Sequence, residues 1–148
     1  MVSIRNDYKS CYRSVSIGFL LGLLAIACED QRRVQCRQLF QIVQSVTQSN
    51  KNISYAADGV KKQSWLKAAN RLTWAADSVS ALKLDRSQLV EYQTRLAKVY
   101  RIYSQATYDA IEARENKNIE ALDRARTSAI EAGKTQQKLF QEINEYCL

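Results

Sequence analysis

The sequence predicts an all-α fold: an antiparallel four-helix up-and-down bundle that follows an N-terminal signal peptide. Three observations lead to this prediction. The chain contains no proline, and after residue 27 the only glycines are Gly59 and Gly133. Ala, Gln, Lys, Arg, Leu and Glu dominate this part, and all of them favour helices. Its apolar residues recur every three or four positions, and the positions of its cysteines require an even number of helices.

The first helix is predicted from about Asp30 to Asp58, with Gly59 as its C-terminal stop. Its apolar or small face consists of Leu39, Ile42, Val46, Ser49, Ile53, Ala56 and Val60. The second helix ends before Lys83, and its face is marked by Trp65, Ala69, Leu72, Ala76, Val79 and Leu82. Both faces have the spacing of a helix that packs against a core.

Asp85 followed by Gln88 resembles a capping box, which predicts the start of the third helix. This helix has the most regular pattern, with Leu89, Tyr92, Leu96, Val99, Tyr103, Ala106, Ala110 and Ala113 on one face. The fourth helix is expected to begin near Ile119 and to end at Cys147. Gly133 and the small residues around it predict a close approach of a neighbouring helix there.

Residues 1–27 have the pattern of a secretory leader. Arg5, Lys9 and Arg13 form a basic head, and an apolar run from Val15 to Ala27 follows. This run reaches only about 20 Å as a helix, which is short of the roughly 30 Å of a bilayer core.

Two processing sites fit the end of this leader. Ala25-Ile26-Ala27 matches an ordinary signal peptidase site. Residues 24–28, "LAIAC", resemble a bacterial lipobox, although Ala25 stands where such a box usually has leucine. In a lipobox the cysteine receives a diacylglyceryl group and becomes the first residue of the mature protein. We therefore expect acylation of Cys28 and a mature domain of residues 28–148, with a soluble secreted protein bearing a free thiol as the alternative.

The cysteine count supports this expectation. Cys11 leaves with the leader, and an exported protein tends to pair the cysteines that remain. If Cys28 carries lipid, Cys36 and Cys147 form one pair. In an antiparallel bundle these two positions meet at one pole only when the number of helices is even, which favours four.

The composition excludes several functions. The chain has no histidine and a single methionine, Met1, so the usual ligands of haem, zinc and copper are missing. It also lacks a Ser-His or Cys-His nucleophile pair and a glycine-rich phosphate loop. We therefore expect a non-catalytic protein without cofactor or bound metal.

Charged residues form two patterns that could serve as a nucleic-acid surface or a cation site. The leader holds three of the 22 basic and one of the 15 acidic residues, so residues 28–148 carry 19 and 14, a net charge of +5. Tyrosines alternate with basic residues on the third helix, but export removes the protein from nucleic acid, and no nucleic-acid partner is expected. An acidic group around the third turn is interpreted as a solvated connection and not as a cation site; it comprises Glu112, Glu115, Glu120 and Asp123.

Three segments carry a resemblance to a known type of protein: "LKAANRLTWAADSVSALKLD", "LVEYQTRLAKVYRIYSQAT" and the closing "INEYC". Together with the leader that ends in cysteine, they resemble small helical lipoproteins of unknown function predicted from cyanobacterial genomes. The resemblance covers most of residues 60–147. It implies an exported helical lipoprotein and supplies no catalytic residues.

The two tryptophans predict where such a protein binds. Trp65 and Trp74 lie nine positions apart, so a helix places them about 180° from each other. Trp65 is expected in the core. Trp74, with Lys67, Asn70 and Arg71, forms the candidate partner-binding site, with partial cover of Trp74 by a neighbouring helix as the alternative.

The function expected from the sequence is that of a lipid-anchored binding or accessory protein. It would serve a membrane complex or an envelope component, on the periplasmic, lumenal or outer side of a bacterial membrane. The alternative is a carrier that holds a small apolar ligand or a lipid between its helices.

Overall fold

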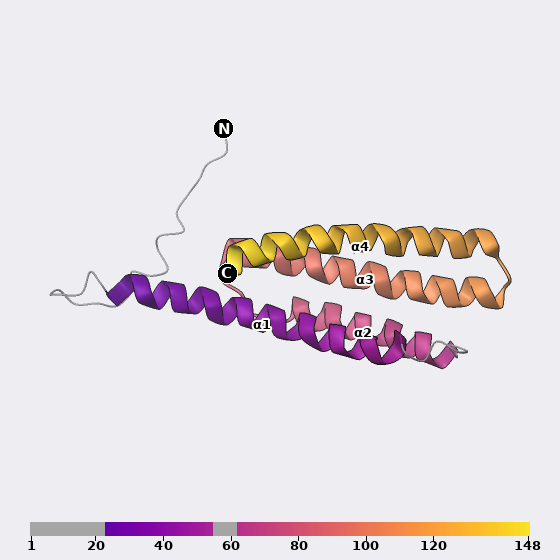
Figure 1. The fold of residues 1–148 in the computed structure, drawn as a ribbon, viewed down its shortest axis with the longest axis horizontal. Helices are drawn as coiled ribbons and strands as arrows, with labels where there is room; N and C mark the ends of the chain where they lie inside the picture. Colours follow the sequence, from indigo (N-terminus) through magenta and orange to yellow (C-terminus); the bar gives the residue numbers. More distant parts are fainter. Residues whose placement is uncertain (1–22, 55–61) are drawn as a thin grey trace, which may run out of the picture.

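Four helices form the fold in the computed structural model, which describes residues 23–54 and 62–148 (Figure 1). They are α1 (Leu23–Ser54), α2 (Lys62–Ser80), α3 (Ser87–Glu115) and α4 (Ile119–Cys147). The chain runs up and down through them, which confirms the predicted all-α bundle. Gly59 and most of the predicted leader lie outside the described residues.

The four helices do not pack equally. α3 is the central helix and packs along α2 on one side and α4 on the other, whereas α1 packs mainly on α2. α1 and α4 meet near the C-terminus and diverge toward the other end of the bundle (Figure 1). The bundle is therefore closed at the pole that holds the C-terminus and opens along the α1–α4 edge.

The core lies where all four helices meet. Its fully buried side chains include Leu39 of α1, Val79 of α2, Leu96 of α3 and Leu139 of α4. Burying one such side chain contributes about 1.5 to 3 kcal/mol. The buried residues of each helix recur every three or four positions, so each helix buries one face and leaves the other in water.

The predicted disulfide bond is confirmed. Cys36 of α1 and Cys147 of α4 are bonded, with 5.9 Å between their Cα atoms and 111 residues of sequence separation. The bond ties the first helix to the last turn of the chain. The expectation that an even number of helices brings these two cysteines to one pole is therefore correct.

Gln93 is a buried polar residue of α3 whose side chain binds the C-terminal end of α2. Its side-chain amide donates to the backbone oxygens of Val79, Ser80 and Leu82, at 2.7, 3.2 and 2.9 Å. These carbonyls lie at the end of α2, where helical partners run out. A single side chain of α3 therefore satisfies the C-terminal turn of α2.

The joint between α3 and α4 combines an ion pair with aromatic contacts. Arg95 donates to both carboxylate oxygens of Glu142, at 2.5 and 3.2 Å, and this hydrogen bonding holds the pKa of Glu142 below its ordinary value. Tyr92 donates to the backbone oxygen of Glu142 at 3.2 Å and packs edge-on against Tyr146. These contacts lie near the disulfide bond and reinforce the same pole.

Two predictions about helix starts are wrong. α1 begins at Leu23 and not near Asp30, so it runs through the predicted boundary at Cys28. The capping box at Asp85 does not form: Arg86 is the N-cap residue of α3, and no side chain caps that helix. The Asp85 carboxylate instead accepts hydrogen bonds from Gln31, at 2.6 Å, and from Gln35, because α1 lies within its reach.

The turn between α3 and α4 is a Schellman motif. Asn118 N–H donates to Ala113 O at 2.8 Å and Lys117 N–H to Arg114 O at 3.2 Å. Lys117 has a φ of 53°, the left-handed conformation that glycine usually supplies at this position. The Asn118 side chain then accepts from the backbone N–H of Ala121 at 3.0 Å and caps α4.

Gly133 provides the close approach that the sequence predicts. A Cβ atom built on this residue of α4 would lie 3.0 Å from the Tyr103 hydroxyl oxygen of α3. Glycine therefore makes room for a tyrosine from the neighbouring helix.

Candidate binding surface

The four residues predicted as a partner site form one stripe on α2. Lys67, Asn70, Arg71 and Trp74 are spaced three or four positions apart, which places them on one face of the helix. All four are exposed, and Trp74 has 55% of its surface accessible. The buried face of α2 lies opposite and consists of Ala69, Leu72, Ala75, Ala76 and Val79. The stripe therefore points away from the core.

Polar contacts from α3 fix one flank of this stripe. The Tyr108 hydroxyl donates to Asn70 Oδ1 at 2.5 Å, and the Arg101 guanidinium lies 3.7 Å from the Asp77 carboxylate. Arg101 also donates to Ser80 Oγ at 3.3 Å. The candidate surface thus extends from α2 onto α3. Sequence reasoning missed this extension, because periodicity does not show which positions of α3 border the stripe.

Trp65 corrects a prediction about the core. It is partly exposed and lies in the first turn of α2, at the end of that helix far from the disulfide bond. The Arg114 guanidinium stacks 5.6 Å from the ring centroid. A pocket of about 220 Å³ opens beside the ring, bordered by Ile111 and by the ion pair of Lys62 with Glu115.

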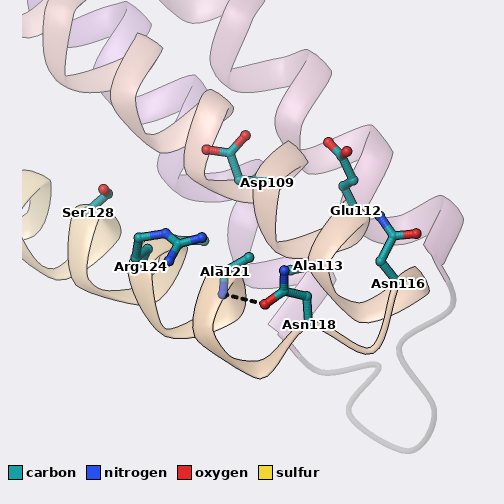
Figure 2. Close-up of a pocket in the computed structure, with 9 residues that line it drawn as sticks. Asp109, Glu112, Ala113, Asn116, Asn118, Ala121, Arg124 and Ser128 are labelled. Carbon is teal, nitrogen blue, oxygen red and sulfur yellow. Dashed lines mark hydrogen bonds between the residues drawn. The ribbon is translucent and has the colours of Figure 1, made fainter.

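A second, larger pocket lies at the turn between α3 and α4 (Figure 2). It has a volume of about 430 Å³, and its lining includes Asp109 and Glu112 of α3 and Arg124 and Ser128 of α4. Arg124 donates to Glu120 at 2.6 Å, so part of the acidic group predicted at this turn is neutralised. Within residues 23–54 and 62–148, no three His, Cys, Asp or Glu side chains gather in a way that could hold a metal ion.

Tyr100 is a buried polar group of α3. The side chain is 1% exposed, and its hydroxyl makes no hydrogen bond to any residue that the structure describes. Burial, with a smaller contribution from Tyr103, raises the pKa of Tyr100 to about 12. The hydroxyl therefore stays neutral near pH 7 and cannot serve as a base there.

The structure describes the backbone of Cys28 but not its side chain. It lies in the N-terminal part of α1, while its side-chain surroundings lie outside the described residues. None of the four described helices combines the length and apolar content that crossing a bilayer requires. Acylation of Cys28 stays a prediction.

The fold and this surface define the class of the protein as a disulfide-linked helical bundle with an exposed aromatic and basic stripe. Comparison of the chain with protein-family models, curated proteins and solved structures gives no match.

Proposed function

We propose that this chain is an exported, lipid-anchored binding protein that serves as an accessory or assembly factor for a membrane complex or envelope component. One observation carries the binding role: Trp74 is 55% exposed among polar neighbours, on the side of α2 opposite the core. A large aromatic side chain contributes more than most others when a partner covers it. Among the described residues, Trp74 is not part of the core that packs the four helices.

The anchor in this proposal is Cys28, near the N-terminal end of α1. The lipobox-like segment before it and the pairing of the other two mature cysteines support acylation. Two or more acyl chains hold a protein stably on a membrane, whereas one does not. The closed pole with the disulfide bond then lies nearest the membrane, and the turn between α3 and α4 lies farthest from it.

The anchor is tested by replacing Cys28 with serine. We expect this variant to leave the membrane fraction or to accumulate as a precursor. The intact mass of the wild-type mature protein should show the added acyl chains at its N-terminal cysteine. An unmodified N-terminal mass would rule the anchor out.

The non-catalytic role rests on the chemistry of the described side chains. With no histidine in the chain, a catalyst would need a perturbed carboxylate, lysine or tyrosine in a pocket. Among the described residues, the carboxylate with a lowered pKa is Glu142, which is held by Arg95, and the tyrosines with raised pKa values include Tyr100, which is buried. Both belong to the packing of the bundle.

The binding role is tested by cross-linking the protein to its partner in native membranes with a lysine-reactive reagent. Trp74→Ala should weaken association by at least 2 kcal/mol, or about 30-fold, with little change in thermal stability. Ile130→Ala on α4 is the matched control, because Ile130 is 49% exposed and lies on another helix. Equal recovery of partner with both variants, or recovery of a bound lipid alone, would contradict the proposal.

A further inference from the structure

We infer that the partner presents an acidic protein segment to a basic–aromatic face of this chain, which we define as Lys67, Arg71 and Trp74 of α2 with Lys98 and Arg101 of α3. The inference rests on the proposed function and names the chemistry of its partner. All five side chains are exposed. Arg101 contacts Asp77 of α2 at 3.7 Å, and Lys98 lies one turn before it on the same side of α3.

The charge of this face is one-sided. It holds four cations, and the acidic residue paired within it is Asp77, so its net charge is +3. Neither Lys67 nor Arg71 forms an ion pair with any residue in the described part of the chain, in contrast to Arg95 and Arg124. These two cations lie about two turns and one turn before Trp74 on α2, where carboxylates of a partner can reach them.

The ion pair between Arg101 of the face and Asp77 beside it can open at low cost. The side chains of Arg101 and Asp77 are 58% and 68% exposed, and ion pairs this exposed contribute about 0 to 1 kcal/mol. A partner carboxylate can therefore replace Asp77 beside Arg101. Acidic groups around an apolar side chain that covers Trp74 would match the face in both charge and polarity.

The position of the face favours a protein over the membrane surface. Cys28 lies about 12 Å before Cys36 along α1. Lys98, the member of the face nearest the closed pole, lies about 9 Å along α3 from Tyr92, which packs on Tyr146 beside the disulfide bond. Every member of the face is thus about 20 Å or more from the level of Cys28, on the flank of the bundle. Attraction to anionic headgroups fades within about 8 to 10 Å.

The test uses the full lipidated protein in washed native membranes and a water-soluble carbodiimide. This reagent joins an amine to a carboxylate in direct contact. It adds to the carboxylate oxygen, the amine then attacks the carboxyl carbon to form an amide, and the reagent leaves with that oxygen as a urea. We expect a cross-linked peptide in which Lys67 Nζ is joined to an Asp or Glu of another protein. Mass spectrometry of the digested adduct identifies both residues.

Three variants separate charge from reactivity and from folding. Lys67→Arg should keep the partner but lose the amide, since a guanidinium does not react. Lys67→Glu combined with Arg71→Glu should reduce partner recovery at least tenfold. The same double reversal at Arg126 and Lys134, exposed cations of α4, should leave recovery unchanged. The melting temperature of each variant shows that the fold is retained.

The outcomes distinguish this inference from the proposed function. If Trp74→Ala loses the partner while the charge reversal does not, the binding role stands and the acidic partner is wrong. If neither change affects recovery, both are wrong. An adduct to a second copy of this chain also overturns the inference. So does binding of the Cys28→Ser protein to phosphatidylglycerol vesicles that depends on Lys67 and Arg71, in the absence of a protein adduct.

Discussion

The disulfide bond should supply a large share of the stability of this bundle. The two bonded cysteines are 111 residues apart in the sequence, and the bond closes a loop of that length. The chain-entropy relation gives about 5 kcal/mol for a loop of that length. For a domain of this size, that corresponds to a loss of about 15 to 20 °C in melting temperature.

The bundle geometry adds a second expectation to the loss of stability. α2, α3 and α4 pack along their lengths, whereas α1 meets α3 and α4 only slightly. When the reduced protein is unfolded by urea, α1 should therefore detach before the other helices unfold. Helix content at low temperature should change little, because α1 remains attached through its packing on α2 and through the bonds from Gln31 and Gln35 to Asp85.

The assay is urea unfolding of the detergent-solubilised mature protein, followed by circular dichroism and by tryptophan fluorescence. Oxidised protein, reduced protein and the Cys36→Ser/Cys147→Ser variant are compared. The reduced protein and the variant should agree with each other and lie about 4 to 5 kcal/mol below the oxidised form. A difference in the free energy of unfolding of under about 1 kcal/mol would show that the bundle is stable without the disulfide bond.

Three further predictions follow from individual residues. Tyr100→Phe should be neutral or stabilising by about 1 kcal/mol, because it removes a buried hydroxyl that has no hydrogen-bond partner among the described residues. The raised pKa of Tyr100 means that the folded state favours the neutral form, so its stabilising contribution is complete below about pH 10 and is lost as pH rises toward 12. Unfolding curves measured between pH 9 and 12 should show a smaller loss in the variant, where only the raised pKa values of Tyr92 and Tyr103 remain. Gln93→Leu should cost about 2 kcal/mol, because the carbonyls that end α2 lose their donor, while exposed Gln105→Leu on the same helix should cost little in the same denaturation assay. Lys117→Gly should raise the melting temperature by a few degrees, since glycine adopts the left-handed φ of 53° without strain; an unchanged or lower value would refute this explanation.

The sequence predicts the helices well because each one repeats a single apolar face. The bounds of α4 follow from periodicity, and the Cys36–Cys147 bond follows from the parity of the helices together with the expected acylation of Cys28. The exposure of Trp74 also follows from its angle to the buried face of α2. Spacing along single helices and the direction of the chain carry this information.

Features that depend on distant residues could not be predicted in this way. Asp85 has the sequence of a capping residue, yet it bonds to Gln31 and Gln35, which lie about fifty positions earlier in the chain. Trp65 has the helical spacing of the buried face of α2, yet it is partly exposed in the first turn, and spacing along one helix does not show where the core ends. The role of Tyr108 beside Asn70 depends on the register between α2 and α3, which a one-helix pattern does not contain.

The bond between Cys36 and Cys147 also determines how this chain responds to cutting and to pulling. A protease that cuts at any peptide bond between these residues opens a ring, and both fragments remain joined and attached to α1. A load applied at the N-terminal end of α1 passes at Cys36 directly into the last turn of α4. Residues 37–146, which include the whole basic–aromatic face, lie off that covalent path and need not extend while the bond holds.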